Sequence, residues 1–206
     1  MKSSIPILLV SLSAACTGVS SDPIDEGLSV LGDKHMFVTS ETYQGGLLGG
    51  LDGADAKCAD RAHAAGLIGR YKAWLSDAHA SAATRLTHSS GTYSLLDETL
   101  VAASWGDLVR TNLEHAIDLD ERHHVYSPPE TCGIVGGIAA VWTGTVADGS
   151  YTLGPGTECG GWTELQHDGF YGNGLAGNAH ASDSHWTDSL CSPTCTDHAA
   201  LYCIEQ

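Results

Sequence analysis

Residues 53–77 read GADAKCADRAHAAGLIGRYKAWLSD, and this stretch predicts a helix that leads into a short strand. Small residues recur at helical spacing along its first half, and Gly66 provides a stop directly after them. The aromatic run at residues 71–75 is typical of a strand or a buried turn. We therefore expect one main helix, at residues 55–65, early in the chain.

The rest of the chain alternates strand-like pieces with glycine-rich turns. We expect strands at residues 35–40, 95–102, 139–143 and 199–205, a loop at residues 45–53, and a short helix at residues 104–108. One early helix, many short strands and a closing strand predict an α+β fold. We assign this domain to residues 34–206, a length that allows a sizeable core.

The seven cysteines divide into one near the N-terminus and six in the body of the chain. An even set of cysteines in a loop-rich domain indicates disulfide bonds and an oxidising compartment. Spacing alone leaves their pairing open. The six are Cys58, Cys132, Cys159, Cys191, Cys195 and Cys203.

The N-terminus predicts export. Residues 1–15 combine a basic residue, an apolar run too short to span a bilayer and small residues before Cys16, which is the pattern of a secretory signal. We interpret Cys16 as the lipid attachment site of a bacterial lipoprotein, because a free thiol is a liability in an oxidising space. Leu12 lies one position further from it than is usual, and ordinary cleavage near Ala15 is the alternative. Residues 16–33 predict a flexible tether.

Charge excludes several classes of partner. The chain carries 9 Lys and Arg against 25 Asp and Glu, a formal net charge of −16. Such an acidic surface repels phosphate backbones and sulfated polysaccharides, so we expect neither nucleic acid nor heparin as a partner. We expect contact with a membrane only through the lipid on Cys16.

Several motifs stand in a fixed order along the chain: GADAKC at residues 53–58, AAGLIGRYKAWLS at 64–76, SW at 104–105 and LYCIE at 201–205. Together they resemble endostatin, the C-terminal domain of certain animal collagens. The strings MFVTS at 36–40, YKAWLSD at 71–77 and VWTGT at 141–145 resemble a bacterial family of endostatin-like domains, often found on lipoproteins. Because endostatin is similar in fold to C-type lectins, the resemblance implies a C-type-lectin-like domain with a mixed, mainly antiparallel sheet.

The resemblance also implies a disulfide scheme. The outer bond of the family pattern corresponds to Cys58–Cys203, and the inner bond corresponds to Cys159–Cys195. Cys132 and Cys191 have no counterpart in that pattern and are left to pair with each other.

The sequence contains none of the common catalytic signatures. It lacks the His-Glu-x-x-His zinc helix, the Gly-x-Ser-x-Gly elbow, the phosphate loop and the dinucleotide fingerprint. With its body cysteines in disulfides, a nucleophilic cysteine is not expected. We therefore predict that the protein is not an enzyme.

Eleven histidines raise the question of a metal site. His180, Asp183 and His185 could bring zinc ligands together, and Asp183 with Asp188 could supply oxygens to calcium. Histidines scattered over an acidic, glycine-rich surface are more often solvated. We predict no metal cofactor and keep calcium and zinc as alternatives.

The sites of the resembling proteins carry over poorly. Of the zinc ligands of endostatin, only His35 and Asp97 fall at matching positions. The sugar-binding C-type lectins use a proline motif that is absent here, although residues 186–188 read WTD. The basic patch by which endostatin binds heparan sulfate is replaced by AHASA at residues 78–82.

The five tryptophans could line a ligand cleft or form the core. In a domain with only two phenylalanines we expect the core, since each tryptophan buries a large area. They are Trp74, Trp105, Trp142, Trp162 and Trp186.

These observations predict an exported, lipid-anchored cell-surface protein with a non-catalytic endostatin-like domain for binding or adhesion. Its expected partner is a protein or a glycan, and its expected location is the outer membrane or the cell surface. A secreted or periplasmic location is the alternative. The alternative functions are a calcium-dependent glycan-binding module and a metal-dependent hydrolase.

Overall fold

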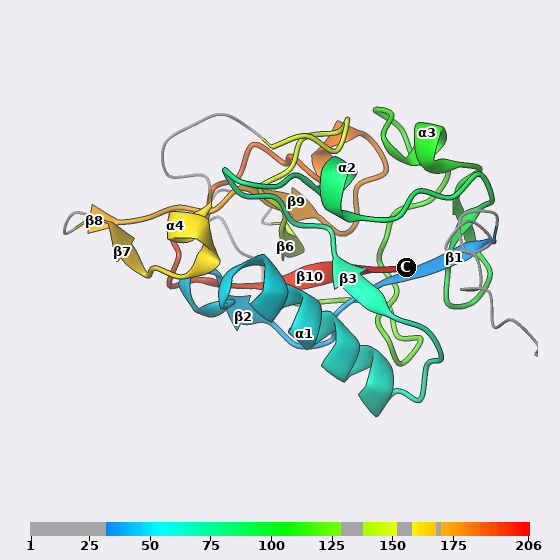
Figure 1. The fold of residues 1–206 in the computed structure, drawn as a ribbon, viewed down its shortest axis with the longest axis horizontal. Coiled ribbons are helices and arrows are strands. Elements are labelled where there is room, and N and C mark those ends of the chain that lie inside the picture. Colours follow the sequence, from blue (N-terminus) through cyan, green and yellow to red (C-terminus); the bar gives the residue numbers. More distant parts are fainter. Residues whose placement is uncertain (1–31, 129–137, 152–157, 168–169) are drawn as a thin grey trace, which may run out of the picture.

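The computed structural model of the protein describes residues 32–128, 138–151, 158–167 and 170–206 (Figure 1). The predicted signal and Cys16 lie outside the described residues, as does most of the predicted tether. The last two residues of the predicted tether are described. The Gly32 carbonyl accepts a hydrogen bond from the Ser89 hydroxyl, and the Asp33 carboxylate accepts one from the Thr92 N–H. None of the helices in the described ranges is both long and apolar enough to cross a bilayer.

A mixed sheet is organised around one long strand, β10 (His198–Glu205), near the C-terminus. Within the described residues the strand order is β5-β4-β1-β10-β6-β9, and β2 and β3 also pair with β10. The other strands are β1 (Lys34–Val38), β2 (Tyr43–Gln44), β3 (Tyr71–Ala73), β4 (Tyr93–Leu95), β5 (Leu100–Ala102), β6 (Ala140–Trp142) and β9 (Ala176–Asn178). The β1–β4 and β10–β6 pairs are parallel and the other pairs are antiparallel. The α+β class and the mixed sheet are therefore confirmed.

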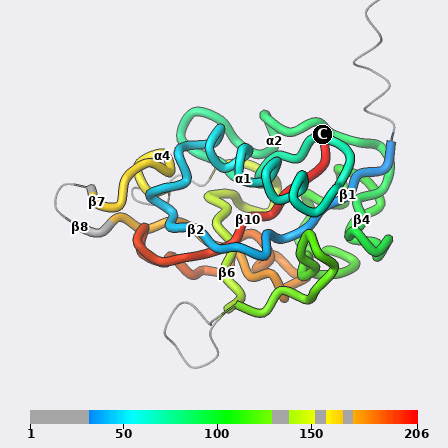
Figure 2. Tube along the Cα trace, turned by 90° about the horizontal axis from the view of Figure 1, so that it is seen from below, coloured from blue at the N-terminus to red at the C-terminus, as the bar shows by residue number. Residues whose placement is uncertain are grey.

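The helices are short apart from α1 (Gly50–Ala64). They are α2 (Ala82–Arg85), α3 (Trp105–Leu108), α4 (Cys159–Trp162) and the 3-10 turns η2 (Gly45–Leu47) and η3 (Ser184–Trp186). A separate hairpin of β7 (Gln166–His167) and β8 (Phe170–Tyr171) lies with α4 at one end of the molecule, while β1 and β4 lie at the other (Figures 1 and 2).

Two local predictions are wrong. The helix begins at Gly50 rather than at residue 55, and the Gly53 N–H donates to the Gly49 carbonyl at 3.2 Å in its first turn. A Cβ on Gly53 would lie 2.1 Å from the carbonyl oxygen of Leu48, the residue after η2. This close contact selects glycine within the first turns despite its low helix propensity. The predicted strand at residues 95–102 is instead the hairpin of β4 and β5, which turns where Asp97 accepts a hydrogen bond from the Thr99 N–H.

Both faces of the sheet are buried, and β10 contributes to both. Ala200, Tyr202 and Ile204 belong to one core cluster, and the alternate residues Ala199, Leu201 and Cys203 belong to the other. Helix α1 covers the second face with Ala54, Cys58 and Ala62. A strand buried on both faces reads as a continuous apolar run, which is why this strand was predictable from sequence.

Four of the five tryptophans are core residues, as predicted. Trp74, Trp142, Trp162 and Trp186 are fully buried. Trp105 is half-buried and stacks on the His88 ring, with ring centroids 3.7 Å apart.

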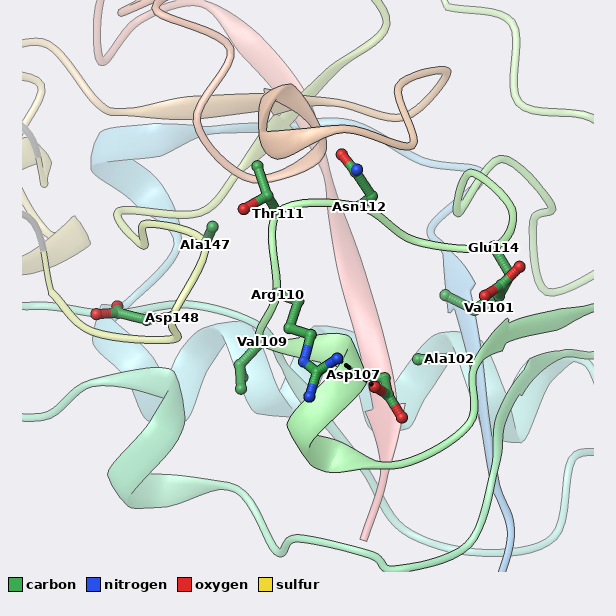
Figure 3. A pocket seen from close by; sticks show the side chains of 10 residues that line it. All are labelled: Val101, Ala102, Asp107, Val109, Arg110, Thr111, Asn112, Glu114, Ala147 and Asp148. Atoms are coloured by element: carbon green, nitrogen blue, oxygen red, sulfur yellow. Dashed lines mark ion pairs between the residues drawn. The ribbon is translucent and has the colours of Figure 1, made fainter.

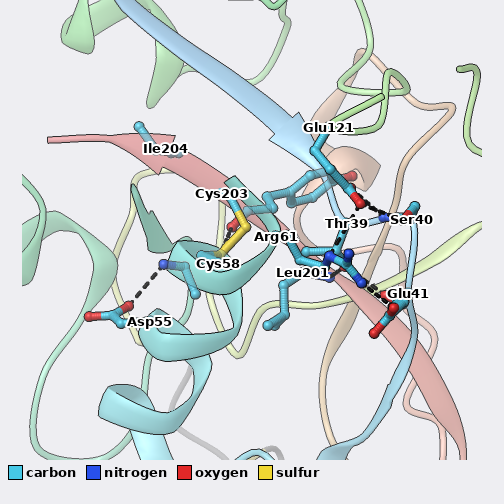
Figure 4. The surroundings of a disulfide bond; sticks show 12 residues. Thr39, Ser40, Glu41, Asp55, Cys58, Arg61, Glu121, Leu201, Cys203 and Ile204 are labelled. Carbon is cyan, nitrogen blue, oxygen red and sulfur yellow. Dashed lines mark hydrogen bonds and ion pairs between the residues drawn. A yellow bond between two sulfur atoms is a disulfide. The ribbon is translucent and has the colours of Figure 1, made fainter. Parts of the chain in front are cut away.

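Disulfides join the helices α1 and α4 to the C-terminal part of the chain. Cys58 of α1 is bonded to Cys203 of β10 (Figure 4). Cys159 of α4 is bonded to Cys195. These are the two pairs that the resemblance implies. Cys191 is also disulfide-bonded, while its expected partner Cys132 lies outside the described residues.

Candidate functional site

A polar cavity of about 650 Å³ opens beside β5 and α3 (Figure 3). Its lining comes from three segments that are far apart in the sequence: β5, the α3 helix with the loop at residues 109–114, and the turn at residues 147–148. Most of its polar side chains lie on loops, which a rigid sheet holds in place. Such loops are where binding groups concentrate in folded domains.

Helix α3 positions the charged pair at one side of the cavity. Ser104 caps the helix: its Oγ accepts a hydrogen bond from the Asp107 N–H at 3.2 Å and donates one to Asp107 Oδ2 at 2.7 Å. Asp107 Oδ1 lies 3.4 Å from Arg110 Nη1. The Arg110 side chain is 74% exposed, so this ion pair leaves most of the guanidinium open to a ligand.

The loop at residues 109–114 is fixed at both ends. The Val109 N–H donates to the Trp105 carbonyl at 3.0 Å, and the Leu113 N–H donates to the Ser182 carbonyl at 2.6 Å. The buried Leu113 side chain packs into the core. The segment between these anchors is therefore held in one path while its side chains remain exposed.

Three polar side chains of the loop are not used by the fold. Thr111, Asn112 and Glu114 line the cavity, and their side chains make no hydrogen bond or ion pair with any other described residue. They offer a hydroxyl, an amide and a carboxylate. Unused donors and acceptors that converge on one cavity are available to hydrogen-bond a ligand.

The opposite wall is a tight turn carrying Asp148. Its Oδ1 accepts a hydrogen bond from the Ser150 N–H at 2.9 Å, and the Ser150 hydrogen bonds lower the pKa of Asp148 below its usual value. The Gly149 carbonyl accepts a hydrogen bond from the Ala83 N–H at 2.9 Å, which ties the turn to α2. The carboxylate is therefore ionised and held in a fixed place.

The lining is rich in hydrogen-bonding groups. It combines donors from Arg110 and Asn112 with acceptors from Glu114 and Asp148, and its described residues include no histidine or cysteine. The arrangement suits a polar ligand with several hydroxyl or amide groups.

The residues considered for a metal lie elsewhere and serve local structure. Asp183 caps η3 by accepting hydrogen bonds from the His185 N–H at 3.0 Å and from His185 Nδ1 at 2.9 Å, and these bonds lower the pKa of Asp183. His180 Nε2 contacts the Tyr126 carbonyl at 2.7 Å, and Asp188 accepts from the Leu190 N–H. Among the described residues, no group of three or more His, Cys, Asp and Glu could hold a metal ion.

The two positions matched to the endostatin zinc site, His35 and Asp97, make contacts with different residues. The His35 ring lies between Glu205 and Glu98, at 3.2 Å from each carboxylate. Asp97 instead forms the turn between β4 and β5.

Sequence reasoning missed the polar cavity. Arg110, Asn112 and Asp148 belong to no motif, and they meet only because the Ser182 carbonyl anchors one loop and α2 anchors the other. No sequence signal for these contacts was available, since both are long-range backbone hydrogen bonds.

The sequence matches no protein-family model and none of the curated proteins. The function of the protein is therefore inferred from its own residues.

Proposed function

We propose that this is an exported, lipid-anchored cell-surface protein whose endostatin-like domain binds a protein or glycan ligand and does not transform it. The observation that carries this proposal is the polar cavity, where Thr111, Asn112 and Glu114 are left unused by the fold. Arg110 and Asp148 add charged groups at its two sides.

The assignment to an endostatin-like, C-type-lectin-like fold has support from topology. The early helix α1 packs against a C-terminal strand at the centre of the sheet, and Cys58–Cys203 joins the two. This is the arrangement that the resemblance implies.

Export is supported by cysteine chemistry. Each of the five body cysteines within the described residues is in a disulfide. Such bonds persist in oxidising compartments and are rare in the cytosol. The predicted signal at residues 1–15 and the lipid on Cys16 would place the domain at the outer membrane or the cell surface.

The charge distribution supports a ligand that is not a polyanion. Arg85 pairs with Asp55 and hydrogen-bonds to the Ala73 carbonyl, so a large part of its charge is used within the fold. Arg61 pairs with Glu41 and Glu121. The net charge of −16 then dominates the field that a polyanion would meet.

The cavity is tested by a binding array of glycans and matrix proteins probed with the full-length protein. We expect Asn112→Ala and Arg110→Gln each to weaken binding of the captured ligand by about 3-fold to 10-fold or more, as expected for one lost hydrogen bond. Arg122→Gln is the matched control, because Arg122 is an exposed arginine outside this lining.

The same array separates the alternatives. Binding that persists in EDTA and weakens in both cavity variants supports the proposal. Binding that is lost in EDTA and restored by calcium would favour the calcium-dependent glycan module. If both cavity variants bound the ligand with unchanged affinity, the ligand would not bind in this cavity.

The lipid anchor is tested by metabolic labelling with a radiolabelled fatty acid. We expect the full-length protein to incorporate the label and to partition with membranes, and Cys16→Ala to lose both properties. Labelling that survives in Cys16→Ala would contradict the anchor and favour ordinary cleavage near Ala15.

A further inference from the structure

A second cavity, of about 440 Å³, lies between α1 and the C-terminus. One exposed face of α1 forms its first wall, and the loop after the helix, β3, Thr87 and Gln206 form the rest. It shares no lining residue with the polar cavity described above. The two cavities are therefore independent sites.

Positive charge gathers around this second cavity in an otherwise acidic protein. The chain has nine Lys and Arg, and eight remain in the described ranges once Lys2 is set aside. Four of these eight lie in or against its walls. Arg70 and Lys72 line the cavity, Arg85 pairs with the wall residue Asp55 at 2.6 Å, and Lys34 Nζ donates to the wall residue Thr87 at 2.9 Å.

Two of these cations are available to a ligand. The Arg70 guanidinium makes no hydrogen bond or ion pair with any other described residue. Lys72 Nζ makes a single long contact, at 3.5 Å, with the Arg85 carbonyl. His63 also lines the cavity.

The negative groups nearby only partly offset this charge. Asp55 is paired with Arg85, and the charge of Glu205 is matched by that of Lys34, whose Nζ donates a hydrogen bond to the Glu205 carbonyl at 3.0 Å. This leaves Arg70 and Lys72 in the lining without a carboxylate partner among the described residues. The cavity therefore carries a net positive charge while the whole chain carries −16.

The remaining walls are apolar. Ala56, Ala59, Leu67 and Tyr71 line the cavity and give it apolar surface. Tyr71 is buried, and burial raises the pKa of its hydroxyl, so it stays neutral. A ligand here meets both apolar surface and free cations.

We propose that this second cavity binds a small organic anion, with its anionic group on Arg70 and Lys72 and its apolar body against Ala59, Leu67 and Tyr71. Charge complementarity selects the anion, because a neutral body of the same shape would leave both cations without a partner. The site goes beyond the ligand binding proposed above and does not depend on it.

The test compares 2-naphthoate with 2-naphthamide, a matched anion and neutral amide, by calorimetric titration of the full-length protein. We expect naphthoate to bind at least about 10-fold more tightly, in line with hydrogen bonds to charged groups. This preference should shrink as salt rises, because salt screens exposed charges. In Arg70→Gln/Lys72→Gln the preference should disappear, and in Arg110→Gln it should remain.

A steric pair of variants checks the location. Ala59→Phe fills the cavity and should abolish binding of naphthoate, whereas Ala64→Phe, exposed on the same helix but outside the lining, should leave it unchanged. Equal affinities for the two compounds, or a preference unchanged in the double variant, would overturn the proposal. Asn112→Ala should not affect naphthoate, so failure here and failure of the proposed function are distinguishable.

Discussion

Replacing Cys58 and Cys203 together by alanine should lower the free energy of unfolding by about 4–5 kcal/mol. The bond joins residues 145 apart in sequence, and closing so long a loop removes much of the conformational entropy of the unfolded chain. Both cysteines are fully buried, so their removal also leaves small voids between α1 and β10 (Figure 4). For a domain of this size the loss corresponds to a fall in Tm of about 10–20 °C.

The measurement is thermal and urea unfolding of the full-length protein under oxidising conditions. The matched control is the Cys159→Ala/Cys195→Ala variant, whose bond spans 36 residues. Its shorter loop predicts a loss smaller by about 1 kcal/mol. A loss of less than about 1 kcal/mol in Cys58→Ala/Cys203→Ala would show that this bond does not hold the helix to the sheet.

The second large effect is expected at Glu121, which holds three segments together. Its side chain is 1% exposed and lies 3.3 Å from Arg61 Nε on α1. It also accepts hydrogen bonds from the Ser40 N–H at 2.8 Å and from the Ser40 hydroxyl (Figure 4). Removing either member of such a buried ion pair leaves the other charge buried without a counter-charge, which destabilises the fold.

Glu121→Ala should destabilise the protein by about 3–5 kcal/mol, because it leaves Arg61, 13% exposed, without its buried counter-charge. Glu41→Ala removes the other partner of Arg61, which is 57% exposed, and should cost less than about 1 kcal/mol. Urea unfolding of both variants measures the difference.

A third variant separates charge burial from packing. Arg61→Met/Glu121→Leu removes both charges, so we expect it to be more stable than Glu121→Ala. If Glu121→Ala and Glu41→Ala were equally mild, the buried ion pair would contribute nothing to the attachment of α1.

Local patterns in the sequence predicted the elements whose structure depends on near neighbours. The helix formers ahead of Gly66 became most of α1, and the closing apolar run became β10. The short helix expected at residues 104–108 became α3. The start of α1 was misplaced, since Gly53 is selected by contact with the Leu48 carbonyl, a contact no local pattern reveals.

The two cavities could not be predicted in the same way. In the polar cavity, Arg110 and Asp148 are 38 residues apart in the sequence. In the second cavity, Arg70 lies beside Gln206 only because β3 pairs with β10. Their side chains carry no periodicity or motif. Whether such a residue faces solvent, a partner or an empty cavity depends on which loops the sheet brings together.

The sequence by itself determined the α+β class, the main helix, the central strand and the set of cysteines available for disulfides, because these follow from composition and from short-range periodicity. Only the tertiary structure decided which polar groups remain unused, since that depends on pairing between β10 and strands more than 100 residues away. The binding sites proposed here follow from those long-range contacts.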